Sequence, residues 1–337
     1  MELALLFVLS GAFLGWSLGG NDAANVFGTA VGTRVIKYRT AIWLSAVAVI
    51  VGALREGQIG IDKLGDFSAK NHITTGLGAF IVMLMAALTV TGMTVLKFPV
   101  STSQCVIGSM IGWGLSQGVN NLGKAKDFYL AWVITPIGAM VICFVLCFFM
   151  ERFVEGKIKG LVGYDMFIKI GYIVAGVFGA YSLGANNTAN ATGIYLNVGL
   201  FNDHVIGSLN GFLRSLHINY AVTPQFLAAL IGGVSIAVGV LTFSKAVMFT
   251  VGEGITHLSP MTGFLAVISC SILVYVFALF GIPVSTSQAV VGAVMGAGFA
   301  KGIHGVDFKV LGRIFVAWFG TPTVAGVVCY LIGILFF

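Results

Sequence analysis

Charged residues are scarce in this sequence. Asp, Glu, Lys and Arg make up only 9% of its 337 residues, whereas soluble globular domains carry about 25%. Proline is also rare, with six residues, and long apolar stretches continue without interruption, as from Thr75 to Leu96. Hydrophobic residues account for 58% of the chain. These values exclude a soluble globular domain and indicate an integral membrane protein.

The short alternating stretches that are typical of membrane β-barrels are also missing, so we expect an all-α membrane protein. Glycine is abundant, with 46 residues, and small residues let membrane helices pack closely. The net charge of +6 comes from Lys and Arg in loops, as the positive-inside rule expects, and therefore predicts no nucleic-acid partner. The five cysteines lie within apolar runs, where packing is their expected role.

Two copies of one unit make up the chain. The segment SLGGNDAANVFG at Ser17–Gly28 returns as SLGANNTANATG at Ser182–Gly193, with seven of twelve residues identical. Farther along each copy, PVSTSQ occurs at 99–104 and again at 283–288, and each is followed by a Trp-x-x-Thr-Pro element. We therefore predict one transmembrane repeat at residues 1–150 and a second at 165–337, joined by a charged linker at 151–164.

Each repeat is expected to contain about six helical segments, or about twelve in the chain. The second and fifth segments of each repeat, at 23–33, 104–118, 189–201 and 288–300, are shorter than the ~20 residues that a span requires. Such paired short segments predict discontinuous or re-entrant helices at a central binding site. The loop after 23–33 carries Arg34, Lys37 and Arg39, whereas its counterpart near 199–206 has no Lys or Arg. This asymmetry predicts that the two repeats are inverted.

The first repeated motif places polar groups inside an apolar segment, which Gly19 and Gly20 are expected to interrupt. An acid at membrane depth costs at least ~2.5 kcal/mol, so Asp22 marks a functional site. Asp22 and Asn25 would share one face of a helix, and the second copy has Asn187 in place of the acid. Interhelical hydrogen bonding is the alternative role. The candidate binding residues are Asn21, Asp22, Asn25, Asn186, Asn187 and Asn190.

The second motif has the features of a helix start. Pro99 and Pro283 break the preceding segments, and Ser and Thr then occupy the N-cap position. The unpaired amides of a first helical turn suit an oxyanion, although a capped helix without a ligand is the alternative. The candidate oxyanion-binding residues here are Ser101, Thr102, Ser103, Ser285, Thr286 and Ser287.

Neither motif contains Lys, Arg or His, so a bound dianion would have no protein countercharge beside Asp22. Sodium ions held by protein oxygen atoms would neutralise both groups and would couple their binding. A protonated oxyanion such as phosphate can also donate a hydrogen bond to Asp22, whereas sulfate cannot. The candidate sodium ligands are Asp22, Asn25, Ser101, Gln104, Asn190, Ser285 and Gln288.

The duplicated patterns Gly-(Gly/Ala)-Asn-(Asp/Asn)-x-Ala-Asn and Pro-Val-Ser-Thr-Ser-Gln closely resemble those of the inorganic phosphate transporter (PiT) family. The resemblance covers essentially the whole chain. It implies an inverted-repeat helical transporter that binds phosphate between its halves through both motifs, with sodium or protons as the coupled ion. Many members have Asp where this chain has Asn187. The sequence Ser-Thr-Ser-Gln lacks the histidine that we associate with proton-coupled bacterial members, which favours sodium.

We therefore expect a multi-pass protein of the cell membrane that imports inorganic phosphate with sodium by alternating access. Proton coupling, transport of another oxyanion such as sulfate, and an anion channel are the alternatives. The sequence shows no Ser/His/Asp order, metal cluster or nucleotide loop, so we expect neither an enzyme nor a bound cofactor. The expected partners are phosphate, sodium ions, the lipid bilayer and, from the glycine-lined surfaces, a second copy in a homodimer. Glu253 is either an accessory ion ligand or a loop acid.

Overall fold

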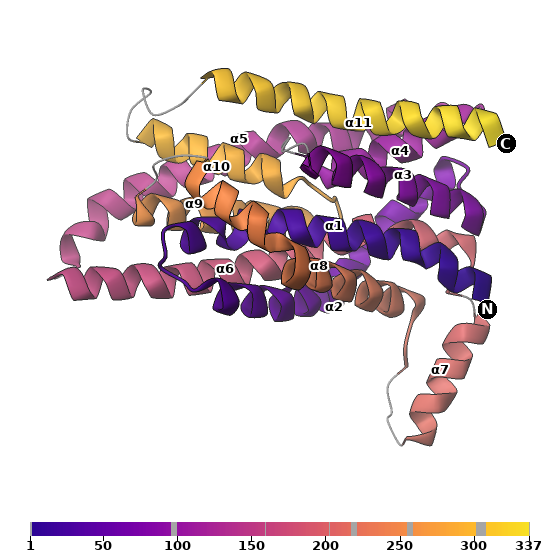
Figure 1. Ribbon diagram of the computed structural model, residues 1–337, viewed down its shortest axis with the longest axis horizontal. Coiled ribbons are helices and arrows are strands. Elements are labelled where there is room, and N and C mark those ends of the chain that lie inside the picture. Colours follow the sequence, from indigo (N-terminus) through magenta and orange to yellow (C-terminus); the bar gives the residue numbers. More distant parts are fainter. Residues whose placement is uncertain are drawn as a thin grey trace.

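The computed structural model describes residues 2–95, 100–158, 160–201, 203–216, 221–254, 259–300 and 308–336. These residues form helices and connections without a strand, and the helices gather into one elongated bundle (Figure 1). The helices are α1 (Glu2–Gly32), α2 (Tyr38–Lys70), α3 (Gly76–Val95), α4 (Thr102–Ser116), α5 (Lys126–Phe153), α6 (Gly160–Thr192), α7 (Asp203–Ser215), α8 (Pro224–Gly254), α9 (Pro260–Leu279), α10 (Thr286–Ala300) and α11 (Phe308–Phe336). Short 3-10 turns are η1 (Leu122–Ala125), η2 (Glu155–Lys157) and η3 (Gly193–Val198).

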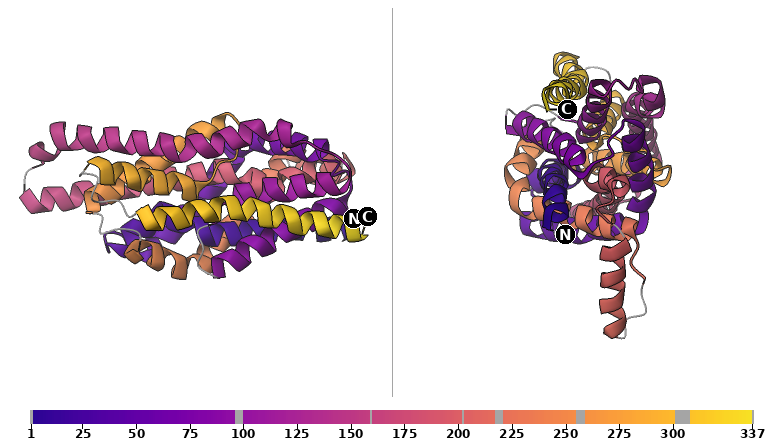
Figure 2. Two further views of the ribbon diagram at one scale, coloured as in Figure 1. Left: turned by 90° about the horizontal axis from the view of Figure 1, so that it is seen from above. Right: turned by 90° about the vertical axis from the view of Figure 1, so that its right-hand side faces the viewer.

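Seven of the described helices are long and apolar enough to cross a membrane, namely α2, α3, α5, α6, α8, α9 and α11. The all-helical membrane fold that the composition predicts is therefore confirmed. Helix α7 differs from the others because it projects sideways from one end of the bundle (Figures 1 and 2).

Each repeat contributes five of the described helices to the bundle, α1 to α5 from the first and α6 and α8 to α11 from the second, and α7 is an additional helix between α6 and α8. Helices α1 and α6 carry the first motif, α4 and α10 begin within the second, and α5 and α11 contain the Trp-x-x-Thr-Pro element. Figure 1 shows that α1 runs away from the end of the bundle where both termini lie, whereas α6 runs toward it. Helices α5 and α11 are opposed in the same way. The repeats are therefore inverted, as the charge asymmetry predicts.

Two helical hairpins, α3–α4 and α9–α10, enter the bundle from opposite ends (Figure 1). Helices α4 and α10 have 15 residues each, or about 22 Å, which is less than the ~30 Å apolar core of a bilayer. The tips of the hairpins meet inside the bundle, where the Ser103 hydroxyl donates a 3.0 Å hydrogen bond to the carbonyl of Val284. The prediction of re-entrant segments is confirmed for these two helices.

The prediction that Gly19 and Gly20 interrupt a helix is wrong. Helix α1 continues through both glycines over 31 residues, and α6 is continuous through the matching motif. Gly19 instead allows close packing, because a Cβ atom at this position would lie 2.0 Å from the carbonyl oxygen of Ile236 on α8. The predicted second segment of the first repeat, 23–33, is thus the end of α1, whereas that of the second repeat, 189–201, begins in the last residues of α6 and continues as η3. Among the described residues, the first repeat has five helices rather than six segments, and the second has the five matching helices and α7 in addition.

Each hairpin packs against the last helix of the other repeat. Helix α4 packs on α11, and α10 packs on α5. A Cβ atom on Gly108 of α4 would lie 2.3 Å from the carbonyl oxygen of Pro322, and one on Gly292 of α10 would lie 2.0 Å from that of Pro136. Both prolines belong to the Trp-x-x-Thr-Pro element. The duplicated element therefore provides the surface on which the opposite hairpin lies. Helix α6 begins at Gly160, inside the predicted linker.

Candidate functional site

The Ser-Thr-Ser motifs form the starts of α4 and α10. The Ser101 hydroxyl accepts a hydrogen bond of 3.4 Å from the backbone N–H of Gln104, and Ser285 accepts one of 3.2 Å from the N–H of Gln288. Both serines are thus N-cap residues, as the motif predicts. Pro99, the predicted helix breaker of the first copy, lies outside the described residues. Both first turns lie within the bundle, so their unpaired amides and positive dipole ends are available to an anion there.

The first motif on α1 meets the start of α10. The Asn25 side-chain amide donates to the Asp22 carboxylate at 3.2 Å, and it also lies 3.3 Å from the hydroxyls of both Thr286 and Ser287. The Thr286 hydroxyl is within hydrogen-bonding reach of the Asp22 carboxylate. The predicted shared face of Asp22 and Asn25 is therefore observed. Asn21 lies to one side and donates to the Thr94 hydroxyl on α3 at 3.2 Å.

The same arrangement recurs where α6 meets α4. The Asn190 amide donates to the Asn187 side-chain oxygen and to the Ser103 hydroxyl, both at 2.9 Å. Asn186 forms a pair of hydrogen bonds with the backbone of Val284 at the second hairpin tip, at 2.8 Å to its carbonyl and 3.0 Å from its N–H. Each first motif therefore contacts the Ser-Thr-Ser turn of the other repeat, so four segments distant in sequence meet at one centre.

Charge in this centre comes from one side chain. Asp22 is 4% exposed, and it is the only Asp, Glu, Lys, Arg or His among the buried side chains that the structure describes. In the matching position of α6, Asn187 is buried and neutral. A carboxylate without a nearby positive group is costly in a low-dielectric environment. The centre therefore favours a ligand that brings positive charge to Asp22.

Several buried polar atoms of the motifs have no hydrogen-bond partner. The side-chain oxygens of Gln104, Asn190 and Gln288 are unpaired acceptors, while the Asn187 amide nitrogen and the Thr102 hydroxyl are unpaired as well. Burying such groups without a partner is unfavourable, so they mark positions where a ligand would be stabilised. Oxygen acceptors are the ligands that hard cations prefer, and N–H and O–H groups can donate to an oxyanion.

Two features near the centre could not be found from the motifs. The first is the exchange of contacts between repeats, which depends on how distant helices pack. The second is a crevice of about 940 Å³ between α4, α5, α10 and α11, whose lining includes Gln104 and Gln288.

Glu253 lies in the last turn of α8, and its side chain is outside the described residues. Among described residues, no three His, Cys, Asp or Glu side chains form a metal-binding group.

An inverted pair of helical repeats, with two re-entrant hairpins meeting at a polar centre, is typical of membrane transporters. The chain matches the "Phosphate transporter family" model twice, over residues 18–161 and 157–329, and it belongs to that family. The protein is therefore a phosphate transporter of the cell membrane with multiple spans, and not an enzyme.

Individual relatives agree with this membership. The chain is 28% identical over 332 residues to a "Putative phosphate permease" of Methanocaldococcus jannaschii, covering 98% of this chain and 96% of that protein. It is 26% identical over 413 residues to "Inorganic phosphate transporter 2-1, chloroplastic" of Arabidopsis thaliana, covering 95% of this chain and 70% of that protein. A solved structure of a protein named "The sodium-dependent phosphate transporter" has the same fold, with a TM-score of 0.78, 24% identity and complete coverage of both chains.

Proposed function

We propose that the protein imports phosphate together with sodium by alternating access. The observation that carries this proposal is the charge of the centre, where Asp22 is buried and no basic side chain is buried among the described residues. Phosphate would add negative charge to a site that already holds a carboxylate. Bound cations would offset the repulsion between phosphate and the Asp22 carboxylate. The affinity for phosphate would then depend on the cation.

Phosphate would lie between the two hairpin tips. The starts of α4 and α10 both open there, because Ser103 contacts Val284 across the interface. The first-turn amides of both helices would donate to phosphate oxygens, together with the hydroxyls and the free Asn187 amide. The proposed phosphate-binding residues are those of the two motifs, namely Asn21, Asp22, Asn25, Ser101, Thr102, Ser103, Asn186, Asn187, Asn190, Ser285, Thr286 and Ser287.

Sodium would bind through protein oxygen atoms next to phosphate. Asp22 supplies the negative ligand, and the unpaired oxygens of Gln104, Asn190 and Gln288 supply neutral ones. Asn25, Ser101 and Ser285 complete the proposed set. Because only the first repeat has an acid in this position, the two pseudo-symmetric halves would bind cations with different strength. The solved transporter with this fold is named as sodium-dependent, which supports the same cation here.

The inverted arrangement supports the proposal of alternating access. In such a fold, the two halves can exchange conformations, and this exchange opens the central site to the opposite membrane face. The swapped packing of α4 on α11 and α10 on α5 gives each hairpin an equivalent support. The proposed motion is therefore a displacement of the α3–α4 hairpin together with α11 relative to the α9–α10 hairpin together with α5.

Phosphate is the preferred anion because it carries a proton near neutral pH. A protonated phosphate oxygen can donate to the Asp22 carboxylate, which also lies near the Thr286 hydroxyl. Sulfate has no proton to donate at this pH, so it would face the carboxylate with repulsion and without that hydrogen bond.

Uptake of radiolabelled phosphate by the purified protein in liposomes tests the proposal. Sodium and proton gradients are imposed separately, at equal membrane potential, and sulfate is added as a competitor. We expect uptake with the inward sodium gradient alone and little inhibition by excess sulfate. Uptake driven by protons in sodium-free vesicles would show proton coupling instead. Preloading with unlabelled phosphate should accelerate uptake of label by exchange, which distinguishes a carrier from an anion channel.

A further inference from the structure

The crevice between α5 and α11 is a second, apolar site on the molecule. Its volume is about 940 Å³, which is within the range of cavities that bind small organic ligands. Helices α5 and α11 form its walls, and α4 and α10 form its floor. The lining is almost entirely apolar, with Trp132, Ile137, Ile111, Met295, Trp318 and Val327 among its residues.

The lining comes from both repeats in matching positions. Trp132 and Pro136 of α5 correspond to Trp318 and Pro322 of α11, and all four line the crevice. Matching parts of the two repeats therefore form the crevice, which lies between the α4–α11 pair and the α10–α5 pair. Its floor also includes Gln104 and Gln288, which follow the two Ser-Thr-Ser turns.

The walls of the crevice are exposed and apolar, as is expected of a surface that faces lipid. Only 22% of the most apolar stretch of α5 is buried within the protein, and the same holds for α11. This share is lower than in any of the other described spans. On these walls, Val133 is 58% exposed and Val327 is 52% exposed. An apolar cavity does not hold ordered water, because water there would lack hydrogen-bond partners. The occupant must therefore be apolar and must enter from the side.

We propose that the crevice binds an acyl chain of a bilayer lipid. The lateral mouth gives a lipid tail direct access, and the lining offers mainly apolar contacts along its length, with Gln104 and Gln288 in the floor as polar exceptions. A bound acyl chain would contact both α5 and α11, on which the hairpins pack, and would lie against Gln104 and Gln288. The crevice borders the phosphate centre, because Gln104 and Gln288, two of the proposed sodium ligands, belong to its floor. The proposal does not depend on which cation is coupled.

The first test is photolabelling of the full chain in liposomes. The lipid is a phosphatidylcholine that carries a diazirine near the terminal methyl of one acyl chain, and labelled residues are mapped by mass spectrometry after illumination. Ile111 on α4 and Met295 on α10 line the crevice and are only partly exposed. We expect label on both, in addition to label on the outer surface of α5. Label restricted to the outer surfaces of α5 and α11 would overturn the proposal.

A matched pair of double variants tests the route of entry. Val133→Phe with Val327→Phe narrows the mouth, because both valines line it. Val141→Phe with Val324→Phe makes the same changes on exposed positions of the same helices that are not in the lining, at 52% and 48% exposure. The first pair should reduce labelling of Ile111 and Met295 at least severalfold, and the second should leave it unchanged. Equal labelling in both would overturn the proposal.

A second copy of the chain is the competing occupant. If it covered the crevice, label would be lost from the mouth valines as well as from the floor, and the labelled protein would cross-link between copies through α5. That outcome would replace the lipid by a homodimer interface. Retained sodium-driven phosphate uptake in the mouth-narrowing variant would show that the variant is folded.

Discussion

Asn190 on α6 donates a 2.9 Å hydrogen bond to the hydroxyl of Ser103 on α4. The inverted counterpart is the contact of Asn25 on α1 with Ser287 on α10, at 3.3 Å. In each pair, the asparagine belongs to one repeat and the serine to the other. The two duplicated motifs therefore form one shared centre rather than two separate sites, and a change in either copy should affect the same bound ligands.

The first prediction concerns the single buried acid. Asp22→Asn keeps the size of the side chain but removes the negative ligand proposed for sodium, so sodium-driven phosphate uptake should fall at least about tenfold, the equivalent of ~1.4 kcal/mol. Asp66→Asn, an exposed acid on α2, is the control and should transport normally. Both proteins should elute alike in size-exclusion chromatography. Normal uptake by Asp22→Asn would remove the carboxylate from the mechanism.

The second prediction concerns the paired serines. Ser103→Ala or Ser287→Ala removes one hydroxyl from the centre, and a lost hydrogen bond costs about 0.5–1.5 kcal/mol. The KM for phosphate should therefore rise severalfold in each variant, as measured by initial uptake rates at saturating sodium. Ser109→Ala is the matched control, because Ser109 is buried in the same helix as Ser103 but has no hydrogen-bond partner. An unchanged KM in both serine variants would assign their hydroxyls a purely structural role.

Sequence patterns were sufficient for the features that depend on neighbouring residues. Ser101 and Ser285 could be recognised as caps because an N-cap hydrogen bond joins residues three apart. The short α4 and α10 could be recognised from their length alone. The inversion of the repeats followed from Arg34, Lys37 and Arg39, since the distribution of basic residues reflects orientation in the membrane.

Features that depend on distant partners could not be predicted in this way. Glycine favours a break in an isolated helix, yet Gly19 continues α1 because Ile236 of α8 packs directly against it. No local pattern identifies that neighbour. The contact of Asn25 with Ser287 depends equally on how two inverted repeats pack, so the candidate residues could be named while their pairing could not.

The third prediction concerns the glycines at which the hairpins pack closely against α5 and α11. Gly292→Ala would place a Cβ atom 2.0 Å from the carbonyl oxygen of Pro136, so α10 would have to move away from α5. Such overpacking typically costs about 1–3 kcal/mol, and the melting temperature in detergent should fall by several degrees. Gly92→Ala on α3 is the control, because no atom lies within 4 Å of its added Cβ. A melting temperature that is the same for both variants would contradict the close packing of α10 on α5.

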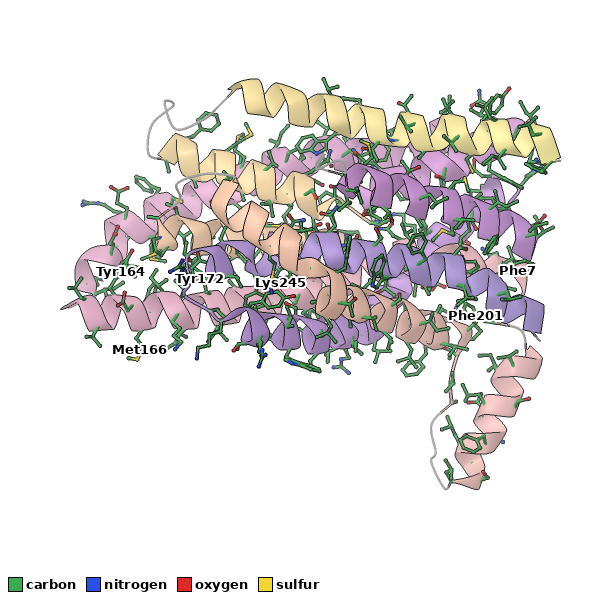
Figure 3. All side chains as sticks on the ribbon, viewed as in Figure 1. Phe7, Tyr164, Met166, Tyr172, Phe201 and Lys245 are labelled. Carbon is green, nitrogen blue, oxygen red and sulfur yellow. The ribbon has the colours of Figure 1, made fainter. Side chains whose placement is uncertain are left out.

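The last prediction concerns orientation in the membrane. Both termini lie at one end of the bundle, together with Phe7 and Phe201, whereas Tyr164 lies at the other (Figure 3). The connection between α1 and α2, at the end away from the termini, carries the basic residues Arg34 and Lys37, Arg39 follows in the first turn of α2, and no acid lies among them. By the positive-inside rule, this end should face the cytoplasm.

Labelling of introduced cysteines measures the orientation. The five native cysteines are buried, so an impermeant maleimide should react little with the unmodified protein. Lys126→Cys, at the exposed start of α5 on the side of the termini, should react in intact cells. Lys157→Cys, exposed in the α5–α6 connection at the opposite end, should react only after the cells are permeabilised. The reverse pattern would place the termini in the cytoplasm and would invert the face on which phosphate first meets the site.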